Sequence, residues 1–110
     1  MRVLLDECCR KPLKNYLPGF EVFTVEQADF KGLKNGDLLS AAIGKFDVLI
    51  TADKNLRYQQ NLKGRTLAII ELPMNSWKRL KPLVPGILAA LSRIKAGQYL
   101  VVPLEISVAK

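Results

Sequence analysis

The chain has 110 residues, of which 49% are hydrophobic and 25% are charged, and it contains no histidine. This length accommodates one hydrophobic core, so we expect a single domain over residues 1–110, and the composition argues against a disordered or fibrous protein. Seventeen Lys and Arg residues against ten Asp and Glu residues give a net charge of +7, which favours phosphate-rich partners such as nucleic acids.

The sequence also argues against a membrane protein and against a zinc site or disulfide framework. No apolar run approaches the roughly 18 to 20 residues that span a bilayer, and the first residues lack the apolar core of a secretion signal. We therefore expect a cytoplasmic protein without membrane contact. The adjacent Cys8 and Cys9 have no other cysteine or histidine to pair with.

The first half of the chain predicts strands that alternate with short helices. Val3–Leu5 is a brief apolar run stopped by acids, which is typical of a buried strand. Pro12 fits the first turn of a helix with Leu13, Tyr16 and Leu17 on its apolar face. The elements expected next are a strand over residues 20–25, a loop, a helix opened by Asn35-Gly36-Asp37 and ended at Gly44, and a strand over residues 48–51.

The second half continues this alternation. It predicts a short polar helix over residues 54–61, a strand over 66–71, a mostly helical segment over 76–96 and a last strand over 99–103. We expect the helical segment to be interrupted around Pro82 and around Pro85-Gly86. The whole pattern indicates a three-layer α/β/α fold, with a parallel sheet of about five strands and right-handed crossovers.

Three aspartates stand where strands end or a helix begins. Asp6 follows the first strand, Asp53 follows the third, and Asp37 lies in the first turn of a helix. The carboxyl ends of parallel strands border one crevice, so these carboxylates are candidates to converge there. Oxygen ligands without His or Cys suit Mg²⁺ or Mn²⁺, which can activate water for attack on a phosphodiester. We therefore interpret all three as candidate metal ligands and catalytic residues.

Each acid also has a structural explanation. Asp53 is a good N-cap for a following helix, and Asp37 would be stabilised by a helix dipole worth only about 0.3 to 1 kcal/mol. Glu7, next to Asp6 in an extended chain, either bonds the loop backbone or approaches the metal. Glu71, at the end of the fourth strand, could add a further acid to the site.

Basic residues close to these acids in sequence are candidates for phosphate contacts. They are Arg10, Lys54 and Arg57. The alternative is that they lie on ordinary solvated helix faces, because long basic side chains are mostly exposed. Trp77, next to two cations, could stack on a nucleic-acid base, but near Leu80 we interpret it as a packed or interface side chain.

Three segments together resemble a known family. They are Leu4-Leu5-Asp6-Glu7, then Asp37-Leu38-Leu39 with Ala41-Ala42, then Val48-Leu49-Ile50-Thr51-Ala52-Asp53. In order and spacing they are similar to the small PIN-like proteins related to the toxin ribonucleases of bacterial toxin-antitoxin pairs.

The resemblance implies a three-layer α/β/α fold in which acids at the positions of Asp6, Asp37 and Asp53 bind Mg²⁺ or Mn²⁺ for RNA cleavage. It also implies an antitoxin partner and frequent dimerisation. For the fourth acid that typical members carry after a later strand, only Glu71 is available in this chain.

Two other functions remain open from the sequence. A phosphorelay receiver domain also has acids after its first and third strands in a similar doubly wound sheet. Its pattern places a lysine before a proline after the last strand, whereas Leu100-Val101-Val102-Pro103 has none, and a net charge of +7 fits it poorly. The other hypothesis is a catalytically silent interaction module, in which the acids cap helices and the basic faces bind a nucleic acid or a protein.

Overall fold

A five-stranded parallel sheet forms the centre of the chain in a computed structural model that describes residues 1–6, 11–33, 35–54 and 66–103. The strand order is β2-β1-β3-β4-β5. The strands are β1 (Arg2–Leu5), β2 (Glu21–Thr24), β3 (Val48–Thr51), β4 (Ala68–Glu71) and β5 (Tyr99–Val101). The predicted α/β fold with about five parallel strands is therefore confirmed.

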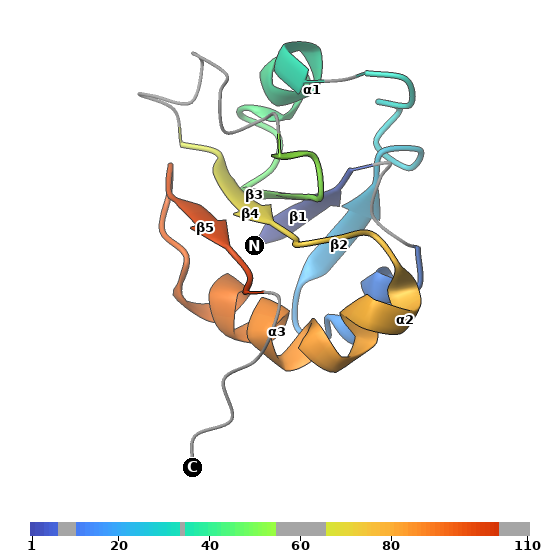
Figure 1. Ribbon diagram of the computed structural model, residues 1–110. Coiled ribbons are helices and arrows are strands. Elements are labelled where there is room, and N and C mark those ends of the chain that lie inside the picture. Colours follow the sequence, from blue (N-terminus) through green and yellow to red (C-terminus); the bar gives the residue numbers. More distant parts are fainter. Residues whose placement is uncertain (7–10, 34, 55–65, 104–110) are drawn as a thin grey trace.

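Helices cover both faces of this sheet. The α-helices are α1 (Asn35–Ala42), α2 (Trp77–Leu80) and α3 (Val84–Arg93), and the described 3-10 helices are η1 (Lys11–Tyr16) and η4 (Lys81–Leu83). Helix α1 lies on one side of the sheet, whereas α2 and α3 lie on the other (Figure 1). The result is the predicted three-layer arrangement. No helix within the described ranges combines the length and the apolar character that crossing a membrane requires.

The central strands are buried because both of their faces are covered. Every residue of β3 and of β4 is buried, as expected for interior strands of a parallel sheet between two helical layers. In contrast, β2 and β5 are the edges of the sheet, and each has an exposed residue, Glu21 and Val101. The apolar composition of Val48–Thr51 thus follows from its place in the middle of the sheet.

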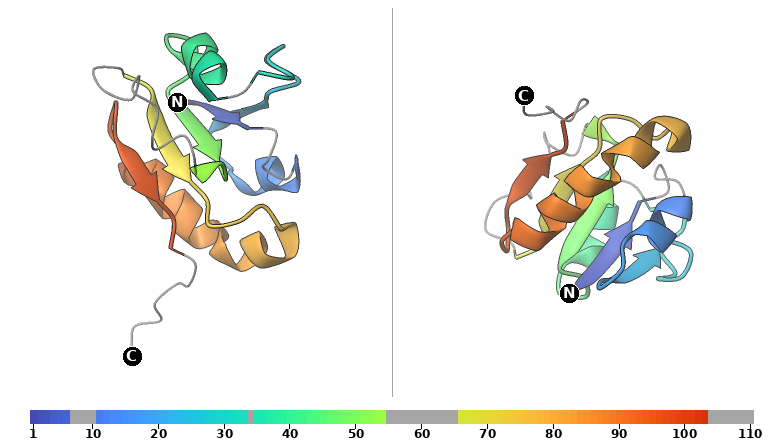
Figure 2. Two further views of the ribbon diagram at one scale, coloured as in Figure 1. Left: turned by 45° about the horizontal axis from the view of Figure 1, so that its top comes forward. Right: turned by 90° about the horizontal axis from the view of Figure 1, so that it is seen from below.

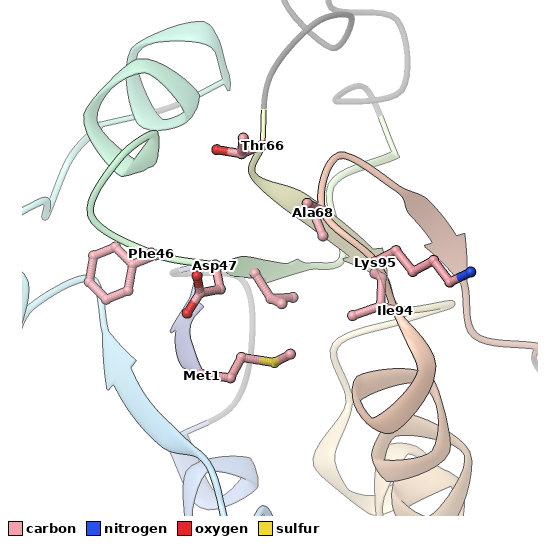
Figure 3. Close-up of a pocket in the computed structure, with 9 residues that line it drawn as sticks. Met1, Phe46, Asp47, Thr66, Ala68, Ile94 and Lys95 are labelled. Carbon is pink, nitrogen blue, oxygen red and sulfur yellow. The ribbon is translucent and has the colours of Figure 1, made fainter.

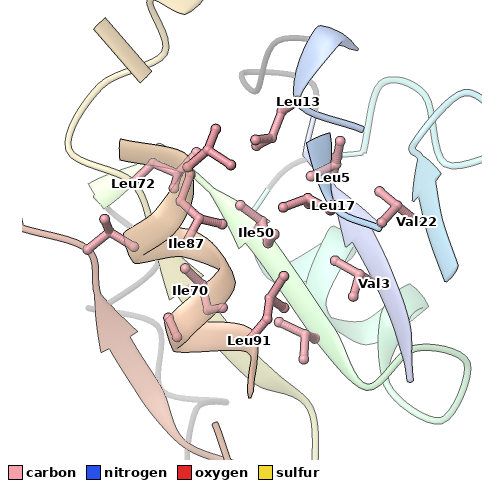
Figure 4. Close-up of a cluster of buried hydrophobic side chains, with 14 of the residues drawn as sticks. Val3, Leu5, Leu13, Leu17, Val22, Ile50, Ile70, Leu72, Ile87 and Leu91 are labelled. Atoms are coloured by element: carbon pink, nitrogen blue, oxygen red, sulfur yellow. The ribbon is translucent and has the colours of Figure 1, made fainter. Parts of the chain in front are cut away.

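The larger part of the hydrophobic core lies between the sheet and α3. Helix α3 inserts Ile87 and Leu91 against strand residues that include Val3, Ile50 and Ile70 (Figure 4). All five side chains are almost completely buried. The right-hand view of Figure 2 shows α3 running along the strands that it covers.

A second part of the core lies on the α1 side. It combines Leu38 and Leu39 of α1 with Leu4, Leu49 and Ile69, each from a different strand. Successive side chains of a strand point to opposite faces, so the residue two positions after each of these strand residues is directed to the same side as α1. This alternation decides which side chains at the ends of the strands meet.

Two details of the helices differ from the sequence-based expectations. The segment from residue 76 onward is interrupted around Pro82 as predicted, because the 3-10 helix η4 separates α2 from α3 there. Pro85 and Gly86, however, lie in the first turn of α3 instead of interrupting it. A proline is tolerated there because its missing N–H would have no intrahelical partner. The helix that contains Pro12 is of the 3-10 type and ends at Tyr16. Leu13 in it and Leu17 just after it are buried as predicted, whereas Tyr16 is exposed.

Other predicted elements match more closely. The helix opened by Asn35-Gly36-Asp37 ends at Ala42, followed by Gly44 in the left-handed region with φ of 84°. Two strands are shorter than predicted. The strand expected over residues 66–71 begins only at Ala68, and the strand expected over residues 99–103 already ends at Val101. Of the helix predicted over residues 54–61, all but Lys54 falls outside the described residues.

Candidate functional site

The candidate site lies at the carboxyl edge of the sheet, between β1 and β3. The chain enters the sheet at β1, places β2 on one side of it and β3 on the other, so this pair of strands is the point where the winding direction reverses. In open α/β sheets, ligands bind in the crevice outside the carboxyl ends of the strands at such a switch point. Asp6 directly follows β1, and Asp53 lies two residues after β3.

Asp6 continues the hydrogen-bonded ladder of β1. Its backbone N–H donates to the Ile50 carbonyl oxygen at 3.0 Å, which keeps the chain extended beside β3. Asp6 is two residues after Leu4, which packs toward α1, so its side chain is directed to that face as well. Its carboxylate is half-buried.

The Thr51 hydroxyl joins the two acids that the sequence placed at this edge. It donates to Oδ2 of Asp6 at 2.7 Å, and it accepts a hydrogen bond from the backbone N–H of Asp53 at 2.9 Å. Thr51 itself is completely buried. One fixed hydroxyl therefore orients the Asp6 carboxylate and also positions the backbone of Asp53 just beyond β3.

Glu71 is a buried acid on the next strand. It pairs with Thr51 in the register of β3 and β4, so the two side chains lie on the same face of adjacent strands. Only 1% of Glu71 is exposed, and its Oε1 accepts a 2.6 Å hydrogen bond from the Tyr99 hydroxyl. Burial of a carboxyl group is costly unless hydrogen bonds compensate for lost water, and Tyr99 supplies such a bond.

Asp37 lies on helix α1, whereas Asp6, Asp53 and Glu71 lie at the ends of strands. It is exposed in the first turn of α1, the helix that covers the same face of the sheet. Among the residues that the structure describes, no three His, Cys, Asp or Glu side chains are grouped so as to hold a metal ion. The convergence of Asp6, Asp37 and Asp53 around one ion therefore stays a prediction.

The predicted cationic contacts are only partly described. Lys54 is exposed and directly follows Asp53. Arg10 and Arg57, together with the candidate ligand Glu7, lie outside the described residues.

The donor chemistry of this edge fits a hard divalent cation. Asp6, Asp53 and Glu71 offer carboxylates at the ends of β1, β3 and β4, and the chain contains no histidine that would favour a softer metal.

Sequence reasoning missed Thr51 and Tyr99. Thr51 is two positions after Leu49, so both side chains point to the same face of β3. Once β1 and β3 are known to be neighbours, this spacing places the Thr51 hydroxyl on the same face as Asp6.

A polar hollow at the carboxyl end of β2 extends the same edge. A volume of about 350 Å³ is lined by Lys14, Asn15, Thr24, Glu26 and Gln27. Gln27 Oε1 accepts hydrogen bonds from Lys14 Nζ at 2.8 Å and from the Thr24 N–H at 3.0 Å. These bonds fix the loop after β2 against η1, so the carboxyl edge is polar from β2 to β4.

A second cavity lies at the opposite, amino edge of the sheet. It also has a volume of about 350 Å³, and Met1, Asp47, Thr66 and Lys95 are among the residues around it (Figure 3). The Asp47 carboxylate there accepts a hydrogen bond from the Arg2 N–H at 2.7 Å. No residue predicted for the site lines this cavity. Substitutions around this cavity therefore lie at the edge of the sheet opposite the candidate site.

The chain matches no protein-family model, and it has no significant match among curated proteins or solved structures.

Proposed function

We propose that the chain is a divalent-metal-dependent ribonuclease of the PIN-like type, whose site is the crevice between β1 and β3. The observation that carries this proposal is the hydrogen-bonded group of Asp6, Thr51 and the Asp53 backbone at the switch point of the sheet. The net charge of +7 over the whole chain suits a polyanionic substrate, because cations attract the phosphate backbone.

Asp6 and Asp53 would hold Mg²⁺ or Mn²⁺, with Asp37 and Glu71 as the further acids on the same face of the sheet. When bound, such an ion supplies a Lewis acid that polarises a phosphodiester and activates a water molecule. The role of Thr51 is to keep the Asp6 carboxylate in one orientation, since its hydroxyl is itself fixed by burial. Glu7 would act as an additional ligand of the ion. The partners of the chain would be an antitoxin protein and a second copy of the chain.

Lys54 is the described residue best placed in sequence to contact the substrate, because it is exposed immediately after Asp53. Together with Arg10 and Arg57, it would bind phosphates on either side of the scissile bond. Such contacts position the substrate and stabilise charge that develops during the reaction.

The proposal is tested by incubating the purified protein with mixed single-stranded RNAs and Mn²⁺. We expect cleavage that stops when the metal is chelated and that is lost in Asp6→Asn and in Asp53→Asn. The matched control is Asp47→Asn at the amino edge, where the amide oxygen can still accept the Arg2 N–H. Cleavage that persists in both site variants would mean a contaminating nuclease or another site, and would contradict the proposal.

A second candidate function is a receiver-like phosphoacceptor. The strand order 2-1-3-4-5 favours it, because receiver domains share this order and bind their ligands at the same switch point. Against it stand the absence of a lysine before Pro103 and the strongly basic charge. Mass spectrometry after incubation with acetyl phosphate and Mg²⁺ separates the two, since a phosphoryl adduct that disappears in Asp53→Asn, without any RNA cleavage, would identify the receiver-like function.

A further inference from the structure

Two aromatic side chains from distant parts of the chain form a pair at the molecular surface. The ring centroids of Tyr16 and Trp77 are 4.9 Å apart, with an angle of 54° between the ring planes. Trp77 is half-buried and packs against the α3 side of the core, which anchors the indole. Tyr16 rests on this anchored ring and exposes 40% of its surface.

This exposure sets Tyr16 apart from the other aromatic side chains that the structure describes. Phe30 and Phe46 are buried and contact each other edge to face, at a centroid distance of 6.0 Å. Large aromatic rings normally contribute to stability by leaving water. A supported but exposed ring instead offers a flat surface on which another ring can stack.

The surface around the pair is strongly basic. Lys78 and Arg79 of α2 and Lys81 of η4 are all exposed, and Lys81 Nζ lies 5.9 Å from the centre of the Tyr16 ring. The segments Lys11–Tyr16 and Trp77–Leu83 contain no acidic residue. An aromatic pair with a cation over one ring and further exposed cations nearby in sequence fits a ligand that has both flat rings and negative charge.

Both segments begin near the edge of the sheet that carries the candidate site. Helix η1 follows the carboxyl end of β1, and α2 follows the carboxyl end of β4. Both lie on the α3 side of the sheet (Figure 1). The alternation of side chains along β1 and β4, in contrast, directs Asp6 and Glu71 to the α1 side. The pair therefore belongs to segments that follow β1 and β4, and it lies on the face of the sheet opposite the acidic group.

We propose that Tyr16 and Trp77 form a stacking platform for a base of single-stranded RNA, with Lys78, Arg79 and Lys81 bound to the flanking phosphates. Proteins that bind single strands combine aromatic platforms with a basic surface in this way, and stacking tolerates any base. The inference rests on the proposed ribonuclease function for the identity of the ligand. It adds that the substrate is single-stranded and reaches the crevice across η1 and α2.

The platform contains the only tryptophan of the chain, so its fluorescence reports on this site alone. The experiment titrates the full chain with a single-stranded RNA of about ten nucleotides, a length within the range that such sites bind. A chelator is present, so that binding is measured without cleavage. We expect saturable quenching of Trp77 emission, and much weaker quenching by the same sequence in a duplex.

Paired substitutions separate stacking from general attraction. Anisotropy of a labelled RNA should show that Tyr16→Leu binds roughly 5- to 150-fold more weakly, whereas Tyr16→Phe, which keeps the ring, binds like the wild type. Lys81→Gln should weaken binding more than Lys95→Gln, which removes the same charge at the amino edge. Circular dichroism and urea unfolding verify that the variants are folded.

Each contrary outcome contradicts a different statement. Unchanged Trp77 emission, equal binding by Tyr16→Leu and Tyr16→Phe, or equal binding of duplex and single strand would overturn the platform, and would leave a protein partner as the explanation for the exposed pair. Normal RNA cleavage by Tyr16→Leu with an unchanged KM would overturn the platform but keep the ribonuclease. Stacking at Trp77 without Mn²⁺-dependent cleavage would keep the platform and contradict the ribonuclease.

Discussion

The Thr51 hydroxyl donates a 2.7 Å hydrogen bond to Oδ2 of Asp6, so the last residue of β3 orients the carboxylate that follows β1. The two residues are 45 positions apart in sequence, and only the pairing of β1 with β3 brings them together. The same hydroxyl accepts the Asp53 N–H. The candidate site is thus assembled at the one place in the sheet where both acids can share a single organising group.

Replacement of Thr51 by valine tests this organising role. Valine has a similar shape but cannot hydrogen-bond, so Asp6 and the Asp53 N–H each lose a partner at a half-buried position. We expect a loss of about 1 to 3 kcal/mol in the free energy of unfolding, measured by urea denaturation, and slower RNA cleavage. Thr51→Ser should restore both. Wild-type stability and activity in Thr51→Val would show that the hydroxyl is not needed to orient Asp6 or to position Asp53.

The buried hydrogen bond between Tyr99 and Glu71 predicts coupling between β5 and β4. Tyr99→Phe removes one hydrogen-bond donor from a buried carboxyl group, which should destabilise the protein by about 1 to 3 kcal/mol. A double-mutant cycle with Glu71→Leu, which removes the acceptor, should give a coupling energy of about 0.5 to 3 kcal/mol from urea unfolding. Additive effects of the two substitutions would indicate that the bond contributes nothing to stability.

Asp37 distinguishes a metal ligand from a helix-terminal charge. Its contribution to the dipole of α1 is worth only about 0.3 to 1 kcal/mol, so Asp37→Asn should scarcely change the unfolding curve. If Asp37 is a metal ligand, however, Asp37→Asn should lower the rate of Mn²⁺-dependent cleavage on the order of ten-fold or more, because groups that support a metal site have effects of this size. A variant that cleaves RNA at the wild-type rate would restrict the site to the β1–β3 crevice.

The α3 layer should dominate the stability of the fold. Ile87 is completely buried between α3 and the sheet, so Ile87→Ala should cost about 2 to 5 kcal/mol through lost burial and a residual cavity. Ser92 on the exposed side of α3 provides the control, and Ser92→Ala should stay within about 0.5 kcal/mol of the wild type. Similar unfolding midpoints for the two variants would contradict this arrangement of the core.

The strands were predictable because each is a short run whose composition reflects its own burial. Val48–Thr51 is buried at every position, and an apolar run of that length already indicated an interior strand. The segment around Pro85 was predicted incorrectly as a break. A proline interrupts a helix only beyond the first turn, and its position within the helix depends on where η4 ends and α3 begins.

The site was predictable only in part. Asp6 and Asp53 follow strand ends, a feature that is visible in sequence, and the structure places the Thr51 hydroxyl between them. The contribution of Thr51 depends on strand order and register, which no local pattern encodes. The pairing of Tyr16 with Trp77 is also a tertiary contact, so the amphipathic pattern around Pro12 wrongly indicated a buried tyrosine.

The central claim is that the carboxylates of the β1–β3 crevice bind a divalent metal, and calorimetric titration with Mn²⁺ tests it most directly. We predict saturable binding to the wild type and to Asp47→Asn, together with loss of that binding in Asp6→Asn and Asp53→Asn while their circular dichroism stays unchanged. Equal Mn²⁺ affinity in all four folded proteins, or no binding by the wild type, would contradict it.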